Sequence, residues 1–215
     1  MLIIILVLIF LFLLNFFTYW ILILKQKLLE STLSEWYKKA FPIIWIICMN
    51  LIPIVNSSFF QPFFNENISY FNQYWLWFIL IGIILVVFGI KIHTLATKLL
   101  RITTNEGESP QLIKKGVYEI VRHPQYLSWF LIYLGITFIF DSFIAIIISP
   151  ILFILTDLLC FLEEKYYLTT KFENNYNQYK KKIPYRLISP PYNYIFIIMG
   201  IIIAYIGFLN IFNIQ

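Results

Sequence analysis

Long apolar runs alternate with short polar segments along this chain. The runs are rich in Ile, Leu, Phe and Val and lie near 2–24, 41–60, 74–95, 125–140, 142–162 and 193–213. A helix of about 20 apolar residues is long enough to cross the hydrocarbon core of a bilayer. The pattern therefore predicts an all-α, polytopic membrane helical bundle of about six transmembrane helices. Pro42 and Pro53 remove backbone donors and are expected to kink or interrupt the second helix.

The fourth and fifth runs predict a helical hairpin that turns at Asp141-Ser142. A helix rises 1.5 Å per residue, so His123 and Glu163 both lie roughly 30 Å from this turn. Arg122-His123 and Glu163-Glu164 should therefore be neighbours at the open end of the hairpin. Successive helix residues point about 100° apart, so one glutamate can pair with Arg122 while the other faces a pocket. The alternative is an Arg122–Glu164 salt bridge that only closes the hairpin.

Composition and charge agree with a membrane protein. The chain is 60% hydrophobic and 13% charged, whereas soluble domains are about 25% charged. All sixteen Lys and Arg fall in or beside 25–39, 91–122 and 165–186. Short cytoplasmic loops carry the Lys/Arg excess, so these three segments should be cytoplasmic and both termini should lie outside. The net charge of +5 then reflects topology and contact with the lipid bilayer, and predicts no nucleic-acid partner.

Several polar residues in the apolar runs carry weaker signals. Cys48 and Cys160 are expected to be core residues, and the two histidines lack metal-ligand spacing, so the sequence predicts no disulfide and no metal. His93 is interpreted as an interfacial histidine with its hydrogen bonds satisfied. Asp157 lies within an apolar run, where an ionisable group is costly and often functional. The first run lacks a preceding basic residue and a cleavage site, so it is expected to be retained.

Two motifs carry a family resemblance. GVYEIVRHPQYLSW over 116–129 is followed about forty residues later by EEKYYLTTKFENNYNQYKKKIPYRLISP over 163–190. This pair resembles the isoprenylcysteine carboxyl methyltransferase and phospholipid methyltransferase superfamily of integral membrane enzymes. The family pattern is Gly-x-Tyr, Arg-His-Pro-x-Tyr-x-Gly, a hairpin, Glu-Glu-x-x-Leu and Phe-Gly-x-x-Tyr-x-x-Tyr. The resemblance covers about 111–190, over a third of the chain.

The resemblance implies methyl transfer from S-adenosylmethionine to a lipid-like or small hydrophobic acceptor. It assigns cofactor contacts to Gly116, Tyr118, His123, Pro124, Tyr126, Glu163 and Glu164, and catalytic roles to Arg122 and Glu164. We expect one structural domain, made of N-terminal helices (1–95), a methyltransferase-like region (96–190) and a C-terminal helix (191–215). The expected location is the bacterial inner membrane, with the site facing the cytoplasm.

The chain departs from the family pattern at three positions. Ser128 and Glu173 replace expected glycines. Counting back from Leu168 and Phe172 places the first acidic position at Glu164 and the second at Lys165, unless one residue has been inserted. These departures leave a non-catalytic relative as one alternative to a methyltransferase. A second alternative is an NADPH-dependent sterol or steroid-type reductase, because members of that family share the Pro-Tyr-Arg tail.

Two local structures can be predicted near the motifs. Pro124 restricts His123 to an extended or turn conformation, in which adjacent side chains diverge, so Arg122 should face the wall opposite His123. Phe172, Tyr176 and Tyr179 recur at helical spacing beside Lys180 and its neighbours. This pattern predicts an amphipathic interfacial helix that packs over the hairpin, or alternatively a lid over the cofactor.

Overall fold

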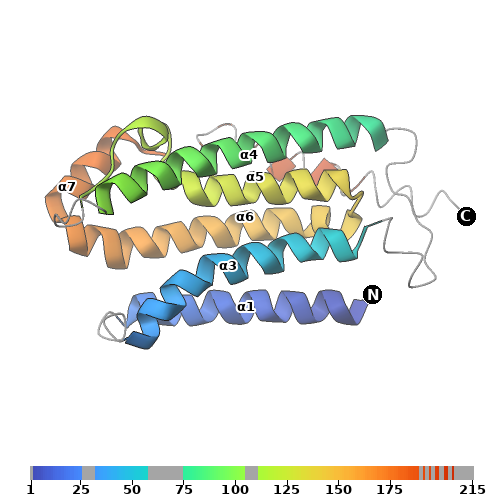
Figure 1. Cartoon of the computed structure of the whole chain (residues 1–215), viewed down its shortest axis with the longest axis horizontal. Helices are drawn as coiled ribbons and strands as arrows, with labels where there is room; N and C mark the ends of the chain where they lie inside the picture. The colour runs from blue at the N-terminus through green and yellow to red at the C-terminus, as the bar shows by residue number, and fades with distance from the viewer. Residues whose placement is uncertain are drawn as a thin grey trace, which may run out of the picture.

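The computed structural model describes residues 2–25, 32–57, 75–104, 111–188 and scattered positions beyond 188, and helices are the regular secondary structure in these ranges (Figure 1). Its α-helices are α1 (Leu2–Leu24), α3 (Thr32–Val55), α4 (Trp75–Thr104), α5 (Pro124–Ile139), α6 (Phe143–Glu163) and α7 (Thr169–Lys182). A 3₁₀ turn, η3 (Gly116–Glu119), precedes α5, and a π-helical turn, η4 (Glu164–Leu168), joins α6 to α7. The predicted helical membrane fold is confirmed.

The described helices include five apolar segments that bear on the number of membrane spans. Helical segments long and apolar enough to cross a bilayer cover Ile3–Leu24, Trp75–Arg101 and Phe143–Lys182, and shorter apolar segments cover Lys39–Val55 and Pro124–Ile139. These five segments match the first five predicted runs. The sixth, near 193–213, lies almost wholly outside the described residues, so the structure does not support a count of six.

Helix α3 differs from its prediction in two respects. It begins at Thr32, well before the apolar run starts, because hydropathy marks the thickness of the bilayer and not the end of the helix. It also continues through Pro42 and Pro53, so the expected interruption at these prolines does not occur, and the alternative of a kink stays a prediction.

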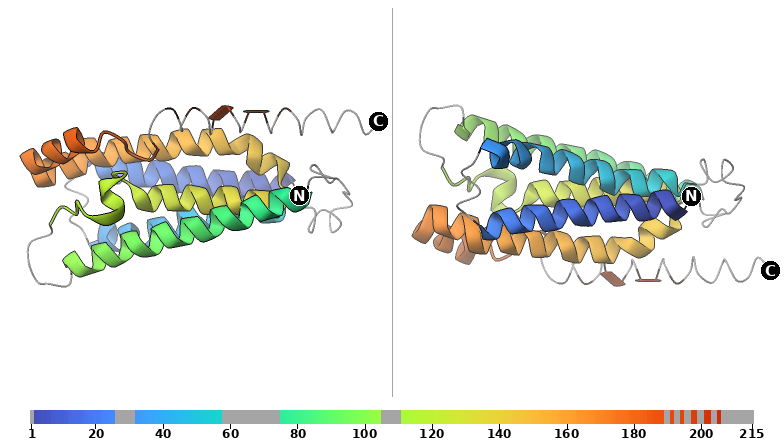
Figure 2. Two further views of the ribbon diagram at one scale, coloured as in Figure 1. Left: turned by 90° about the horizontal axis from the view of Figure 1, so that it is seen from above. Right: turned by 90° about the horizontal axis from the view of Figure 1, so that it is seen from below.

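Helix α5 lies at the centre of the bundle and contacts α3, α4 and α6, while α1 packs along α3 (Figures 1 and 2). Helix α4 is the outermost of these helices, with 11% of its apolar span buried. Because its outward face is apolar, α4 is suited to contact with lipid tails.

Close approach of α4 and α5 depends on glycine. A Cβ atom added to Gly82 would lie 2.6 Å from the carbonyl oxygen of Gly135, and one added to Gly135 would lie 2.6 Å from the carbonyl oxygen of Gly82. Small residues of this kind let membrane helices pack backbone to backbone. This contact sets the distance between the two helices and therefore the position of the α4 side chains that face the site.

The predicted hairpin turn is present at Asp141-Ser142. Asp141 adopts a left-handed conformation with φ 51°, and the side-chain oxygen of Asn56, at the end of α3, accepts hydrogen bonds from Ser142 Oγ (3.0 Å) and the Ile144 amide (3.1 Å). These bonds satisfy donors at the start of α6. They also fix the hairpin against α3.

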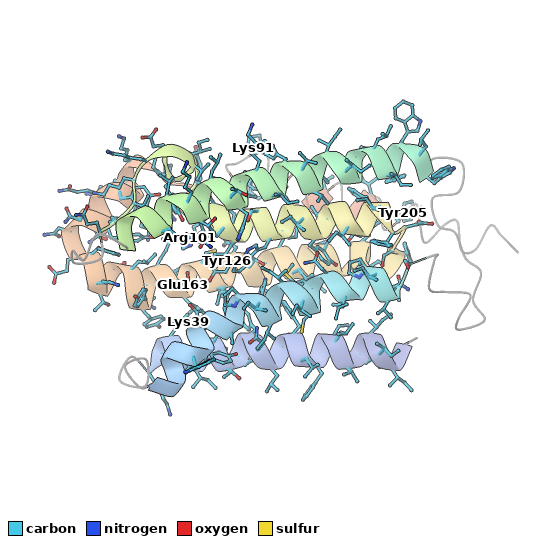
Figure 3. The ribbon with its side chains drawn as sticks, in the orientation of Figure 1. Lys39, Lys91, Arg101, Tyr126, Glu163 and Tyr205 are labelled. Atoms are coloured by element: carbon cyan, nitrogen blue, oxygen red, sulfur yellow. The ribbon has the colours of Figure 1, made fainter. Side chains whose placement is uncertain are left out.

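Figure 1 shows that α1 ends, α3 begins, α4 ends and α5 begins at the end of the bundle where α7 lies. We call this end the basic end, because Lys25 follows α1, Arg122 precedes α5 and α7 ends with lysines 180–182. Figure 3 shows Lys39 and Arg101 towards the same end. The first residues of α1 lie at the opposite end. This arrangement brings the three basic segments of the sequence together.

Candidate active site

A cavity of ≈ 640 Å³ lies towards the basic end. Its walls come from α1 (Tyr19), α3 (including Phe41 and Ile46), α4 (His93, Thr97 and Leu100), the segment 111–126 and the α6–α7 region. Figure 3 shows Tyr126 on α5 and Glu163 on α6 at neighbouring positions towards this end. The cavity is within the usual size range for small-molecule sites, which is about 300–1,000 Å³.

Glu164 is the centre of a buried ionic cluster beside the cavity. Its Oε1 accepts from Arg122 Nε (2.7 Å) and lies 3.1 Å from His123 Nε2, and its Oε2 accepts from Arg122 Nη2 (3.1 Å) and Arg186 Nε (3.4 Å). The Arg122 and Glu164 side chains are 2% and 1% exposed. A bidentate, charge-assisted pair of this kind is strong and geometrically specific. We name Arg122, His123, Glu164 and Arg186 the ionic cluster.

Glu163 has a different environment from its neighbour. It lines the cavity, and its Oε1 accepts hydrogen bonds from Tyr126 Oη (2.5 Å) and Tyr19 Oη (2.8 Å). Its Oε2 lies 3.9 Å from His123 Nδ1. The two tyrosines come from α5 and α1, so they hold the carboxylate from two sides. Glu163 therefore presents an oriented carboxylate at the cavity wall.

The chain around Arg122 is fixed by backbone pairing. The amides of Arg122 and His123 donate to the carbonyls of Tyr185 (3.0 Å) and Arg186 (2.9 Å), and Arg122 Nη1 donates to the carbonyl of Ile183 (2.6 Å). Pro124 begins α5, where its missing donor costs nothing. The prediction that Arg122 and His123 face opposite walls is wrong. Both side chains reach Glu164 Oε1, because the strand-like contact with 183–186 turns them towards the same carboxylate.

Most of the residues predicted for the site lie at the cavity. The walls include Tyr118, Arg122, His123, Pro124, Tyr126 and Glu163. Glu164 lies behind the wall in the ionic cluster. Gly116 is exposed and outside the lining, and its φ of 63° shows a conformational reason for glycine at the start of η3. The catalytic and cofactor-binding roles of these residues stay predictions.

Helix α7 covers the cavity at the basic end. Phe172, Tyr176 and Tyr179 line it, and Tyr176 and Tyr179 are buried. The Tyr179 hydroxyl donates to the carbonyl of Tyr118 (2.7 Å). Burial, reinforced by the nearby Tyr179, raises the pKa of the Tyr118 phenol, which therefore stays neutral at physiological pH. The amphipathic pattern predicted a helix over the hairpin, and the helix found there also forms one wall of the cavity.

The π-helical turn η4 bears on the spacing of the acidic motif. The amide of Thr169 donates to the carbonyl of Glu164, five residues earlier. A π turn therefore holds one residue more than an α turn. One extra residue between the acidic pair and Leu168 is what the inserted form of the motif requires. The structure thus favours Glu163-Glu164, and not Glu164-Lys165, as the acidic pair.

Glu173, which stands where the family pattern has glycine, has an unusual backbone conformation. Its φ is 42° and its ψ is −120°, within a helix that is otherwise regular. A positive φ is strained for a residue with a Cβ atom and unstrained for glycine. The backbone at this position thus has a positive φ that favours glycine, although the residue is glutamate.

Sequence reasoning missed several cavity residues. Tyr19, Phe41, Trp129 and Tyr167 all line the cavity, and His93 lies there too, although it was interpreted only as an interfacial histidine. Tyr19 and Phe41 belong to apolar runs that carry no motif, and their rings stack with centroids 3.8 Å apart. No pattern in the sequence brings these helices to the motif, so only the packing of the bundle could identify them.

Asp157 has a partner that the sequence did not indicate. Its Oδ2 accepts from Arg186 Nη1 at 2.7 Å, so Arg186 bridges Asp157 and Glu164.

Within the ranges that the structure describes, no group of three or more His, Cys, Asp or Glu side chains is placed to hold a metal ion.

Comparison with known proteins supports the family resemblance. Residues 77–175, from α4 to α7, match the phospholipid methyltransferase family. The chain is similar to two proteins named protein-S-isoprenylcysteine O-methyltransferase. The one from Schizosaccharomyces pombe is 31% identical over 87 residues, which is 39% of this chain and 35% of the relative. The one from Xenopus laevis is 30% identical over 121 residues, which is 50% of this chain and 40% of the relative.

These matches span less than half the length of either curated relative. No solved structure matches the chain. The family match includes the first motif of the candidate site, residues 163–175 of the second motif, and the part of α4 that carries His93. The resemblance of this chain to the isoprenylcysteine carboxyl methyltransferase and phospholipid methyltransferase superfamily of integral membrane methyltransferases is confirmed.

Proposed function

We propose that this chain transfers a methyl group from S-adenosylmethionine to a lipid-like, membrane-accessible acceptor, as an enzyme of the isoprenylcysteine carboxyl methyltransferase type. The observation that carries the proposal is a cavity with an oriented carboxylate, Glu163, at the basic end and apolar walls deeper in the bundle. We further propose that the basic end faces the cytoplasm, since Lys and Arg are enriched there.

The chemical groups at the basic end fit S-adenosylmethionine. The Glu163 carboxylate suits its ammonium group, and Lys171 at the same cavity suits its carboxylate. The faces of Tyr19, Tyr126 and Tyr167 can stabilise a sulfonium by cation–π attraction. When bound, the cofactor supplies an activated methyl group on a positively charged sulfur.

The deeper part of the cavity suits an apolar acceptor. Ile43 and Ile46 of α3 line it, and Ile43 is 59% exposed. An acceptor with a long apolar chain can enter from the lipid and place its reactive end near Tyr126. The role of the protein is then to hold two reactants in line and to exclude water.

The ionic cluster has a positioning role in this proposal. Three donors of Arg122 are engaged by Glu164 and Ile183, so its guanidinium braces the junction of the hairpin with 183–186. His123 lies between Glu164 and Glu163. The cluster thereby keeps Glu163 at the cavity wall.

A methyl-incorporation assay tests the proposed function. Full-length protein in proteoliposomes is incubated with S-adenosylmethionine tritiated on its methyl group and with S-farnesyl-N-acetylcysteine as the probe. We expect tritium in the lipid extract, released by mild alkali as methanol, because a methyl ester is alkali-labile. Glu163→Gln should incorporate much less. If the wild-type protein incorporates no more tritium into the lipid extract than liposomes without protein, it is not a methyltransferase that acts on this class of acceptor.

A further inference from the structure

His93 has one ring nitrogen whose role is set by its neighbours. Its Nδ1 lies 3.2 Å from Trp129 Nε1, which donates to it, and 3.2 Å from Ser128 Oγ. An indole N–H can only donate a hydrogen bond, so His93 Nδ1 must be an acceptor without a hydrogen. The imidazole is then neutral and carries its hydrogen on Nε2. Trp129 therefore locks His93 in a single tautomer.

The remaining N–H of His93 is free to serve a ligand. Within the described part of the chain, no residue hydrogen-bonds to Nε2, and the His93 side chain lines the cavity. Thr97 also lines this wall, but its hydroxyl donates to the His93 carbonyl of its own helix (2.8 Å). His93 is thus a polar residue of the cavity wall whose Nε2–H has no hydrogen-bond partner among the described residues.

His93 lies deeper in the bundle than the ionic cluster. Its partner Trp129 is six residues beyond His123 along α5, which corresponds to about 9 Å of helix rise. The ionic cluster and Glu163 lie at the basic end, where the cofactor is proposed to bind. His93 therefore faces the part of the cavity proposed for the acceptor.

We propose that His93 is a positioning residue that donates its Nε2–H to an oxygen atom of the methyl acceptor. This inference rests on the proposed function, which already implies a carboxylate acceptor, and adds the residue that orients it. A protonated amine has no lone pair to offer this donor. A neutral acceptor, such as an alcohol, must lose a proton during methyl transfer. His93 cannot take up that proton, because its Nδ1 already accepts a hydrogen bond from Trp129.

A carboxylate can accept the hydrogen bond from His93 and needs no base. Its oxygen accepts the Nε2–H bond, and it is already ionised at neutral pH. In the transfer, a lone pair of the carboxylate forms the new O–CH₃ bond, and the pair of the breaking S–CH₃ bond returns to sulfur. No proton moves, and the negative and positive charges of the reactants are both neutralised. His93 then fixes the angle of the carboxylate relative to the methyl group.

Ser128 links this arrangement to a departure from the family pattern. It replaces the expected glycine, is fully buried, and donates its hydroxyl hydrogen to the carbonyl of Gln125 (2.6 Å). Its oxygen lies against His93 Nδ1. Serine in place of the expected glycine at position 128 thus contacts the His93 imidazole.

Kinetics on purified full-length protein in nanodiscs test the inference. With S-farnesyl-N-acetylcysteine as the carboxylate probe, we expect His93→Leu to lower kcat/KM by about tenfold or more, the effect of losing a hydrogen bond to a charged group. S-adenosylmethionine affinity should be unchanged. His93→Gln keeps an N–H donor and should recover most of the loss. Thr94→Val, at an exposed position on the same helix, is the control and should match the wild type.

A spectroscopic readout is independent of turnover. The chain has two histidines, so ¹⁵N-histidine labelling gives a simple NMR spectrum that His93→Gln assigns. We expect the Nε2–H tautomer for His93, a mixture of tautomers in Trp129→Phe, and a shift of the Nε2 signal when the carboxylate probe is added. Dioleoylphosphatidylethanolamine, as an amine probe, should leave this signal in place.

Three results would overturn the inference. They are unchanged kcat/KM in His93→Leu, an equal loss of S-adenosylmethionine affinity in that variant, and a protonated Nδ1 in the wild-type spectrum. Each of these can occur with an active wild-type enzyme and leaves the proposed function standing. Wild-type protein that neither binds S-adenosylmethionine nor methylates either probe would overturn both.

Discussion

Two adjacent glutamates separate the structural and the ligand-facing parts of this site. Both oxygens of Glu164 are bonded within the ionic cluster, and its side chain is 1% exposed. Glu163 is held by two tyrosine hydroxyls and lines the cavity. The difference follows from helix geometry, since consecutive side chains point about 100° apart. An acidic pair can therefore provide one residue to stabilise the fold and another to bind a ligand.

The largest expected effect is the loss of stability in Glu164→Ala. Removing one partner of a buried ion pair leaves the other charges uncompensated, at a cost of about 3–5 kcal/mol. The thermal melting temperature should fall sharply. Glu163→Ala is the matched control on the neighbouring residue and should melt close to the wild type. Equal melting of the two variants would remove the distinction between the glutamates.

Arg122→Lys should also act mainly on stability. Lysine keeps the charge but cannot hold both oxygens of Glu164 and the Ile183 carbonyl at once. We expect a loss of about 2 kcal/mol in the free energy of unfolding, as for a charged hydrogen bond, measured by denaturation in detergent. If turnover falls in this variant while stability is preserved, Arg122 acts on the acceptor, as the family resemblance suggests.

Glu163→Gln should weaken S-adenosylmethionine binding while stability changes little. The amide keeps the shape of the side chain and loses the charge that would pair with the cofactor ammonium. A lost charged hydrogen bond of about 1.5–3 kcal/mol corresponds to tenfold or more in the dissociation constant. Equilibrium binding measures this effect, and a cofactor affinity equal to that of the wild type would place the ammonium elsewhere.

Tyr126→Phe should have a smaller effect on the same property. It removes one of the two hydroxyls that orient Glu163, a neutral donor worth about 1 kcal/mol. We expect cofactor affinity to fall roughly fivefold. The double variant Tyr126→Phe with Glu163→Gln should be little worse than Glu163→Gln alone, because the two residues act through one contact. Fully additive losses would show that Tyr126 binds the cofactor directly.

The smallest expected effect is a gain of stability in Glu173→Gly. The backbone at this residue has a positive φ, so glycine should relieve strain of about 1 kcal/mol. Thermal melting checks this, with Glu173→Ala as the control that keeps a Cβ atom. A destabilised glycine variant would show that the kink in α7 has another cause.

The sequence predicted those parts of the site that depend on fixed helix geometry. The rise per residue brought Arg122-His123 beside Glu163-Glu164 across the hairpin, and the structure confirms this. It could not predict Tyr19, because the placement of α1 against α6 depends on packing of the whole bundle. The convergence of Arg122 and His123 was also missed, since it arises from pairing with 185–186, far along the chain.

The backbone conformation at the acidic motif could not be predicted from the sequence either. The spacing to Leu168 left two choices for the acidic pair, and only the π turn over Glu164–Leu168 favours one of them. Such turns are rare, and no motif in this sequence marked one at this position. The strained backbone at Glu173 was visible in the sequence only as a departure from an expected glycine.

Titration of the purified protein with S-adenosylmethionine and with NADPH tests the central claim most directly. Isothermal calorimetry in nanodiscs should show saturable binding of S-adenosylmethionine, weakened at least tenfold by Glu163→Gln, and no saturable binding of NADPH. Binding of NADPH in place of S-adenosylmethionine would contradict the account and favour a reductase.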